Sequence, residues 1–290
     1  MTTMTGNLLV SVVIPNRNRT SVLYRAIMSV VNQSYKNWEI IVVDDSDEEI
    51  FKEIKEHYRD MENIHIYRGD KKGDYGARCK GFALSKGEYV AFLDSDDYWD
   101  ANKLEKHVRV LADHDNVAVS WDNLYREKLN GEKVRVAPFN RGNAGGIVPQ
   151  RTILKEMIKE NFIHMSCGVI RKNAITNTGG PFMESPFDYV LWINLATRYP
   201  FAHIDEYLTI KTDSLDWLGS DKRVLFRENW NITKLKLSVL SKYHDQLTKR
   251  EVIYSLIRVI FMSIGIHVLM PPNMRKFFKP LLYFTGVAIK

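Results

Sequence analysis

The chain has 290 residues, of which 45% are hydrophobic and 26% are charged, as is typical of a globular protein. With only 2 cysteines, 16 glycines and 9 prolines, it cannot be a disulfide scaffold, a collagen-like chain or a low-complexity chain. The length predicts one large domain or one domain with an appendage. Cys79 and Cys167 are expected to be free thiols of a reducing compartment.

The net charge of +6 is unevenly distributed along the chain. Residues 216–290 contain 13 Lys and Arg against 5 Asp and Glu, which leaves the preceding 215 residues with a net charge of −2. A basic segment after a mildly acidic body indicates an anionic partner for that segment. No charged and then apolar leader opens the sequence, and the longest uncharged apolar run, Val259–Met270, is too short to span a bilayer. We therefore expect a cytoplasmic protein.

In the first hundred residues, β-branched runs alternate with amphipathic stretches. The expected strands are Val10–Pro15, Glu39–Val43, Ile64–Tyr67 and Glu88–Leu93, and the expected helices are Ser21–Gln33, Glu48–Tyr58 and Gly76–Lys86. This alternation predicts βαβ units, and so an α/β fold with a Rossmann-like, mostly parallel sheet flanked by helices. Because ligands bind beyond the carboxyl ends of such strands, the clusters Pro15–Arg19, Asp44–Asp47 and Asp94–Asp97 should meet in one crevice.

The second half of the chain is less regular. It contains expected strands at Val117–Trp121, Cys167–Ile170 and Phe201–Ile210, and expected helices at Ile153–Glu160 and Asp188–Thr197. Asn130-Gly131 predicts a hairpin turn, and Pro138–Pro149 is typical of a loop. From Asp221 onward the pattern is helical, with a break at Pro271-Pro272.

The sequence Asp94-Ser95-Asp96-Asp97 is the most informative cluster. Three carboxylates at one strand end repel one another, and a cation would compensate that repulsion. Oxygen ligands without a nearby His or Cys in the sequence suit Mg²⁺ or Mn²⁺ and not zinc. The alternative is an acidic turn that caps a helix beginning near Asp100.

The cluster Asp44–Asp47 has two other interpretations. Its acidic residues could cap a helix, or they could form the acidic pocket of a receiver-type signalling module. A receiver requires an acidic pair after the first strand and an acceptor Asp after the third. Here the first strand ends at Pro15-Asn16 and the third at Arg68-Gly69-Asp70, so the order does not match.

Three motifs together resemble those of the family 2 glycosyltransferases, which have the GT-A fold. They are V-S-V-V-I-P-N-R-N-R at residues 10–19, S-V-V-N-Q-S-Y-K-N-W-E-I-I-V-V-D-D-S at residues 29–46, and A-R-C-K-G-F-A-L-S-K-G-E-Y-V-A-F-L-D-S-D-D at residues 77–97. G-G-P-F at residues 179–182 and F-D-Y-V-L-W at residues 187–192 are similar to later motifs of the same family. The resemblance covers roughly residues 8–212.

The resemblance implies a role for each matched residue. Pro15, Asn16 and Arg17 would line the nucleotide pocket, and Asp45 would accept a hydrogen bond from the base. Arg78 would lie near the nucleotide or its diphosphate, and Asp94 would hold the ribose side. Asp96 of the D-x-D motif would bind Mg²⁺ or Mn²⁺, and Asp188 would be the catalytic base. A carboxylate acceptor suits an imide N–H such as that of uracil, and guanine also offers donors. We favour a UDP-sugar as the donor, with a GDP- or dTDP-sugar as the alternatives.

The implied reaction is an inverting transfer of a sugar from a nucleotide-sugar to a hydroxyl of a glycan or lipid-linked acceptor. A carboxylate would take the proton of that hydroxyl as it attacks the anomeric carbon. A metal and an arginine would neutralise the leaving diphosphate. The reaction needs no covalent nucleophile.

Three positions depart from the family pattern. Cys79 replaces an amide residue, Phe187 replaces the acidic residue before Asp188, and Lys211-Thr212-Asp213 stands where the family often has R-x-H. Glu184 is the alternative base. These departures keep open a rival interpretation, a catalytically inactive partner subunit that binds the sugar nucleotide.

His164, His203 and His267 are interpreted as core or surface histidines because each lies in an apolar stretch.

The predicted domains are a catalytic domain at residues 1–215 and a basic, apolar helical extension at residues 216–290. Within the extension, Val252–Met270 and Phe277–Ile289 combine bulky apolar residues with basic ones, as in helices that lie on an anionic membrane surface. We expect peripheral attachment at the inner face of the membrane. The alternative is that these stretches pack on the protein or form a homo-oligomer contact. No nucleic-acid-binding motif accompanies the charge.

Overall fold

The computed structural model describes residues 8–136, 145–180, 187–213, 232 and 234–242. The chain divides into two compact units, one of residues 1–154 and 161–218 and the other of residues 155–160 and 219–290. In the second unit, residues 234–242 are helical. The apolar stretches Val252–Met270 and Phe277–Ile289 lie outside the described residues. Among the described helices, none has the length and apolar character needed to cross a membrane.

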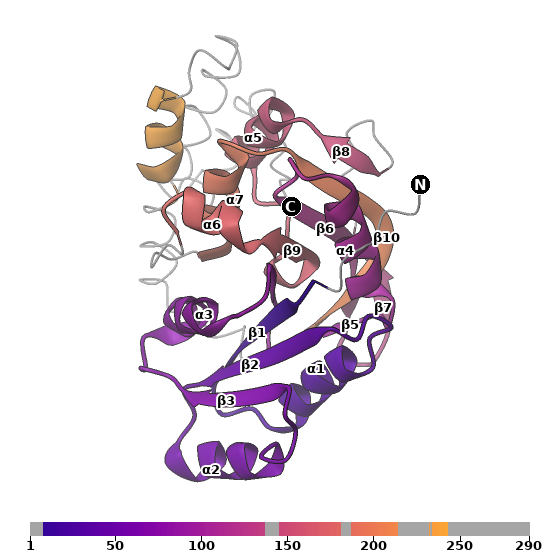
Figure 1. Cartoon of the computed structure of the whole chain (residues 1–290), viewed down its shortest axis with the longest axis vertical. Helices are drawn as coiled ribbons and strands as arrows, with labels where there is room; N and C mark the ends of the chain where they lie inside the picture. The colour runs from indigo at the N-terminus through magenta and orange to yellow at the C-terminus, as the bar shows by residue number, and fades with distance from the viewer. Residues whose placement is uncertain (1–7, 137–144, 181–186, 214–231, 233, 243–290) are drawn as a thin grey trace, which may run out of the picture. The chain divides into compact units, whose positions relative to one another are not determined.

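A ten-stranded sheet forms the centre of the first unit (Figure 1). Its main order is β3-β2-β1-β4-β9-β6-β10-β5, while β7 pairs with β6 and β8 with β10. The strands are β1 Val10–Asn16, β2 Trp38–Asp44, β3 Ile64–Arg68, β4 Tyr89–Phe92, β5 Tyr98–Trp99, β6 Val119–Glu127, β7 Lys133–Arg135, β8 Gly146–Val148, β9 Gly168–Arg171 and β10 Phe201–Thr212.

Strands β3, β2, β1 and β4 are parallel, as the βαβ pattern predicts. Beyond them the sheet is mixed: β9 runs antiparallel to both β4 and β6, whereas β10 is parallel to β6 and antiparallel to β5 and β8. The predicted α/β fold is therefore confirmed. The parallel arrangement that gives it its Rossmann-like character is concentrated in the N-terminal half.

The helices are α1 Ser21–Val31, α2 Glu48–His57, α3 Gly73–Leu84, α4 Lys103–Asp113, α5 Gln150–Lys159, α6 Lys172–Asn177 and α7 Phe187–Ala196, with a 3₁₀ turn η1 at Met165–Cys167. The hairpin predicted at Asn130-Gly131 is confirmed, because β6 and β7 pair antiparallel around it. Strand β8 lies inside the stretch Pro138–Pro149 that the sequence indicated as a loop, and residues 137–144 of that stretch lie outside the described residues. The sequence did not indicate the short elements β5 and α6.

Alternating side chains of the parallel strands explain why helices cover both faces of the sheet. On β2, Ile40 and Val42 join the core that includes α1 and α2, whereas Ile41 and Val43 pack with Ala77 of α3. Figure 1 shows α3 on the opposite side of these strands from α1 and α2. Gly81 allows α3 to approach β1 closely, because an added Cβ would stand 2.3 Å from Cγ1 of Val13.

A buried ion pair connects α4 to the second half of the sheet. The side chains of Lys103 on α4 and Asp122 on β6 have no exposed surface and contact each other directly. Lys103 Nζ also donates to the carbonyl oxygen of Cys167 at 3.0 Å and to Oγ1 of Thr209 at 3.2 Å. Because a buried charge without a partner is strongly unfavourable, these contacts fix α4, β6, η1 and β10 relative to one another.

The substitution Lys103→Met is expected to lower the free energy of unfolding by about 3–5 kcal/mol, because it leaves the Asp122 carboxylate buried and uncompensated. The double variant Lys103→Met/Asp122→Leu should recover most of this loss, since it removes both charges. Urea unfolding of both variants measures the difference. A loss of stability that is equal or larger in the double variant would contradict this account.

Candidate active site

A cavity of about 1110 Å³ lies at the carboxyl ends of β1, β2 and β4. The seven donor-side and metal residues predicted from the sequence all line it, namely Pro15, Asn16, Arg17, Asp45, Arg78, Asp94 and Asp96. Six of them lie at or just after the ends of β1, β2 and β4, and Arg78 lies on α3. The parallel register of β2, β1 and β4 places these three strand ends at one edge of the sheet. The predicted crevice is therefore present.

At one end of the cavity, Asp44 holds the turns after β1 and β2 together. Its Oδ1 accepts hydrogen bonds from Nδ2 of Asn16 at 3.0 Å and from the main-chain N–H of Ser46 at 3.1 Å. The side chain of the next residue, Asp45, lines the cavity, and its Oδ1 accepts the N–H of Lys71 at 2.8 Å. Asp45 lies against Gly69, where an added Cβ would stand only 2.1 Å from its Oδ1. Gly69 thus makes room for the Asp45 carboxylate.

Arg78 on α3 compensates the first aspartate of the turn after β4. Its guanidinium contacts Oδ2 of Asp74 at 2.5 Å and Oδ1 of Asp94 at 2.7 Å. Burial disfavours the charged forms of Arg78 and Asp94, but their mutual attraction is stronger: it raises the pKa of Arg78 and holds the pKa of Asp94 below its usual value. Arg78 and Asp94 are therefore a fixed ion pair in the cavity wall.

Asp96 and Asp97 differ in how they are held. Asp96 faces Nη1 of Arg19 at 3.0 Å on the cavity wall, and burial raises its pKa. Asp97 is buried. Its Oδ2 accepts a hydrogen bond from the hydroxyl of Ser166 at 2.6 Å, and its Oδ1 accepts one from the main-chain N–H of Thr212 at 3.3 Å. Burial, together with the neighbouring charge of Asp94, raises the pKa of Asp97 well above its usual value.

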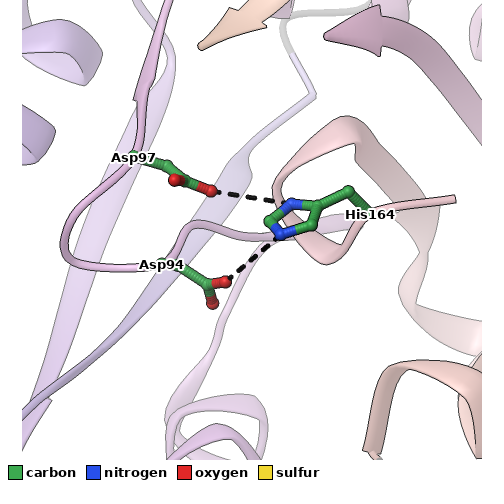
Figure 2. A group of neighbouring side chains, drawn as sticks. All are labelled: Asp94, Asp97 and His164. Carbon is green, nitrogen blue, oxygen red and sulfur yellow. Dashed lines mark ion pairs between the residues drawn. The ribbon is translucent and has the colours of Figure 1, made fainter. Parts of the chain in front are cut away.

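His164 lies between two of these carboxylates (Figure 2), with Nε2 at 3.9 Å from Oδ2 of Asp94 and Nδ1 at 3.6 Å from Oδ2 of Asp97. Burial lowers the pKa of His164 to about 4, so the ring is neutral near pH 7. From the sequence, no histidine was expected near the acidic cluster, and that expectation is wrong. The turn η1, which follows His164 directly, brings the ring to the carboxylates from a distant part of the chain.

A divalent cation fits this group of side chains. Ligand atoms of Asp94, Asp97 and His164 all lie within 4.8 Å of one another, and Asp96 lines the same cavity. Burial and mutual repulsion raise the pKa of both Asp96 and Asp97, which is the condition that a bound cation would relieve. Carboxylate oxygens in excess over nitrogen ligands suit Mg²⁺ or Mn²⁺.

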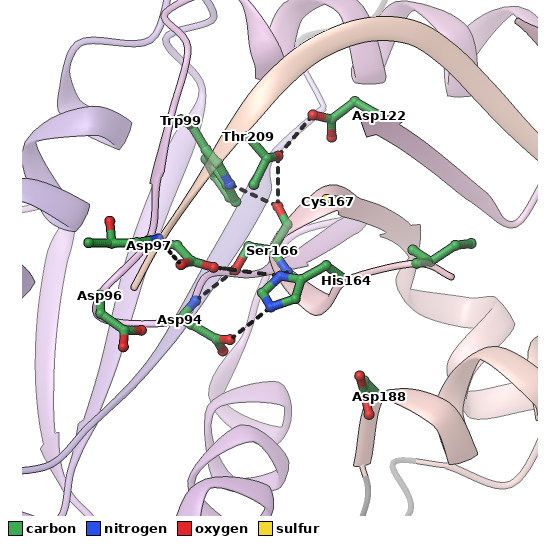
Figure 3. Close-up of polar contacts among 12 residues, drawn as sticks. Asp94, Asp96, Asp97, Trp99, Asp122, His164, Ser166, Cys167, Asp188 and Thr209 are labelled. Carbon is green, nitrogen blue, oxygen red and sulfur yellow. Dashed lines mark hydrogen bonds and ion pairs between the residues drawn. The ribbon is translucent and has the colours of Figure 1, made fainter. Parts of the chain in front are cut away.

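Asp188 lies at the start of α7, apart from Asp94, Asp96 and Asp97 (Figure 3). It is not among the residues that line the cavity. Its Oδ2 accepts a hydrogen bond from Nδ2 of Asn161 at 2.8 Å. Burial raises the pKa of Asp188, while the positive charge of Arg78 opposes that increase. The charges of Arg78 and Asp94 both influence Asp188, so it belongs to the electrostatic environment of the cavity. Glu184, the alternative base, lies outside the described residues.

The wall formed by β6, the β6–β7 hairpin and β10 was not indicated by the sequence. It contributes apolar and basic side chains to the cavity, namely Leu124, Arg126, Leu129, Val136 and Lys211. Leu129 and Val136 are exposed large hydrophobic residues. Asp213, one of the departures from the family pattern, pairs through its Oδ1 with Nε of Arg126 at 2.6 Å.

The other two departures have local structural explanations. Phe187 lies beside Arg78, with its ring centroid 5.7 Å from the guanidinium carbon, and makes an edge contact with Phe92 at 5.4 Å. Cys79 is buried on α3, and burial raises the pKa of its thiol to about 11. The thiol is therefore protonated and acts as a small packing residue.

Known proteins are similar to this chain in sequence and in fold. The family described as glycosyl transferase family 2 matches residues 11–178. The UDP-Glc:alpha-D-GlcNAc-diphosphoundecaprenol beta-1,3-glucosyltransferases WfaP and WfgD of Escherichia coli are 31% and 30% identical to this chain; the alignments cover 66% and 64% of this chain and 71% and 69% of those proteins. The crystal structure of S. aureus TarS 1-349 in complex with UDP-GlcNAc is similar in fold, with a TM-score of 0.69 and 16% identity over 92% of this chain and 78% of that one.

Asn161→Ala is expected to raise the pKa of Asp188 further, because the charged carboxylate loses the hydrogen bond from Asn161 Nδ2. Carbon-detected NMR titration of the Asp188 carboxyl, assigned with Asp188→Asn, measures the shift. A pKa of Asp188 that falls in the variant would contradict the arrangement described.

Proposed function

The chain belongs to glycosyltransferase family 2, and from this premise we propose that it moves a sugar from a UDP-sugar to a hydroxyl of a lipid-linked acceptor. UDP-glucose is the first donor to test, because the relatives WfaP and WfgD are named as using it. Their named acceptor, alpha-D-GlcNAc-diphosphoundecaprenol, is the first acceptor to test.

The convergence of the donor-side residues in one cavity is the observation that supports the proposal most strongly. Asn16, Asp45, Arg78, Asp94 and Asp96 all line it. In the proposed arrangement, Asp45 accepts the imide N–H of uracil, and Asp94 faces the ribose. Arg78 supplies positive charge on the diphosphate side.

The proposed mechanism is an inverting displacement, with Asp188 as the base. Its raised pKa and its position near Arg78 and Asp94 suit a carboxylate that takes the proton of the acceptor hydroxyl. Asp96 would hold a divalent cation, and that ion, when bound, would neutralise charge on the leaving diphosphate. Arg78 orients Asp94 at 2.7 Å, and Arg19 orients Asp96 at 3.0 Å.

The wall of Leu124, Leu129, Val136, Arg126 and Lys211 is the proposed acceptor side. Its apolar side chains suit the lipid portion of an acceptor, and its two cations suit a diphosphate. We also propose that residues 1–215 form the catalytic domain and residues 216–290 a basic extension.

The experiment that tests the function combines the enzyme with UDP-glucose, Mn²⁺ and a GlcNAc-diphosphate lipid, and measures release of UDP. The wild-type chain should release UDP only when the acceptor is present. Asp188→Asn should still bind UDP-glucose but lose about 100-fold in transfer, or roughly 3 kcal/mol, because the base acts in the transition state. If Asp188→Asn transfers normally, Asp188 is not the base and Glu184→Gln is tested next. Binding without turnover across a panel of nucleotide sugars would support the rival, an inactive partner subunit.

Asp96→Asn is expected to weaken Mn²⁺ binding in the presence of UDP and to lower turnover by about 100-fold, because it removes one ligand charge. Electron paramagnetic resonance of Mn²⁺ measures the binding. His164→Gln tests the other candidate ligands: if it weakens Mn²⁺ binding more than Asp96→Asn does, Asp94, Asp97 and His164 hold the ion instead. Full activity of Asp96→Asn in the presence of a chelator would exclude this metal assignment.

We further propose that the basic extension holds the enzyme on an anionic membrane surface, on the cytoplasmic side. Support comes from the sequence of residues 216–290, with 13 basic and 5 acidic residues, and from the lipid-linked acceptor of the named relatives.

The intact chain should float with anionic liposomes at low salt. The variant Arg275→Gln/Lys276→Gln/Lys279→Gln should float less, because each cation contributes on the order of 1 kcal/mol. If the intact chain floats with neither anionic nor neutral vesicles, the extension packs on the protein or forms an oligomer contact instead.

A further inference from the structure

We infer that Arg25 on α1 is a positioning residue for the acidic turn, acting through main-chain and side-chain contacts behind the cavity wall. The inference rests on the proposed function, in which Asp96 holds a divalent cation. Arg25 itself does not line the cavity, whereas Asp96 and Thr212 do. Arg25 borders a separate, smaller hollow of about 380 Å³ with Tyr24 and Tyr98.

The guanidinium of Arg25 binds three groups that belong to three different segments. Nη2 donates to the carbonyl oxygen of Asp96 at 3.4 Å and to Oγ1 of Thr212 at 2.7 Å. Nη1 contacts Oε2 of Glu127 at 2.9 Å. A single side chain of α1 therefore connects the acidic turn to the ends of β10 and β6.

The position of Arg25 is itself fixed from two sides. Its guanidinium carbon lies 4.4 Å from the centroid of the Tyr98 ring, and the Tyr98 hydroxyl donates to Oε1 of Glu127 at 2.8 Å. The side chain of Glu127 is 14% exposed and that of Arg25 is 38% exposed, so the pair is anchored on its carboxylate side. Tyr98 and Glu127 together hold the planar guanidinium in one orientation.

The contacts reach Asp97 as well as Asp96. Thr212, whose hydroxyl binds Arg25, donates its main-chain N–H to Oδ1 of Asp97 at 3.3 Å. Arg25 thus holds the carbonyl of Asp96 directly, and it holds the strand end that binds Asp97. Moving this side chain would change the direction in which the Asp96 carboxylate points into the cavity.

The chemistry of this position requires arginine. Three acceptors on three segments match the forked donors of a guanidinium, whereas a lysine ammonium is a point charge that cannot lie flat on Tyr98 and reach all of them. Arg25→Lys therefore keeps the charge opposite Glu127 and loses the geometry.

The test measures Mn²⁺ binding with and without UDP, by electron paramagnetic resonance, in the full-length chain. Arg25→Met and Arg25→Lys should each weaken Mn²⁺ binding about 10-fold, as expected for a side chain that orients a metal ligand. They should lower kcat by a similar factor and leave the KM for UDP-glucose within about twofold, because Arg25 does not touch the cavity. If Arg25→Met does not fold, Arg25→Lys alone provides the test.

Arg171→Met is the matched control. Arg171 also stacks on a tyrosine, with its guanidinium carbon 5.5 Å from the Tyr89 ring centroid, and it donates to main-chain carbonyls including that of Val117 at 2.9 Å. It does not line the cavity. We expect Arg171→Met to lower the Tm and to leave Mn²⁺ binding unchanged.

Asp96→Asn separates failure of this inference from failure of the proposed function. If Asp96→Asn weakens Mn²⁺ binding and neither Arg25 variant does, Arg25 has no positioning role. If the Arg25 and Arg171 variants weaken Mn²⁺ binding equally, the effect is a general loss of stability and the inference is wrong. If Asp96→Asn binds Mn²⁺ as the wild type does, the proposed metal assignment fails instead.

Discussion

The buried ammonium of Lys103 determines how the second half of the chain meets the first. Its charge is compensated by Asp122, and its remaining donors reach the carbonyl of Cys167 and the hydroxyl of Thr209. Those two contacts hold η1 and β10 in place. The carbonyl oxygen of Ser166 in η1 also accepts a hydrogen bond from Nε1 of Trp99 at 2.8 Å (Figure 3). With η1 fixed in this way, Ser166 and His164 are held against the acidic turn, and an element far from that turn in sequence becomes part of the site.

The three aspartates of the acidic turn are compensated in three different ways, which indicates where a cation would bind. Asp94 is paired with the buried Arg78, and Asp97 accepts a hydroxyl and a main-chain N–H. Disturbing these buried contacts would leave charges or donors unpaired. The Asp96–Arg19 pair has the more exposed cation, since the side chain of Arg19 is 30% exposed and that of Arg78 is 9% exposed. Asp96 can therefore exchange its partner for a cation at the least cost, which supports it over Asp97 and His164.

Local sequence pattern was sufficient to predict the parallel half of the fold and its clusters. The alternation of β-branched runs with amphipathic helices gave β1 to β4, and strand ends gave the turns that carry Asn16, Asp45 and Asp94. The pattern could not predict that β9 runs antiparallel to its neighbours or that His164 lies beside the acidic turn, because both depend on contacts between distant segments. The two-residue strand β5 is too short to leave a periodicity. The wall proposed for the acceptor was not predicted for a similar reason, since Leu124 and Val136 become neighbours only through the hairpin.

The surroundings of Asp188 bear on the choice between an active enzyme and an inactive partner subunit. Replacing the acidic neighbour with Phe187 removes a like charge and places an aromatic ring beside Arg78, so Arg78 remains available to Asp94. Asp188 keeps a hydrogen bond from Asn161 and a pKa that burial raises. A raised pKa suits a group that takes up a proton, and a protein that only binds a nucleotide has no need of one at this position. These contacts support the proposed role of Asp188 as the base, and with it an active transferase.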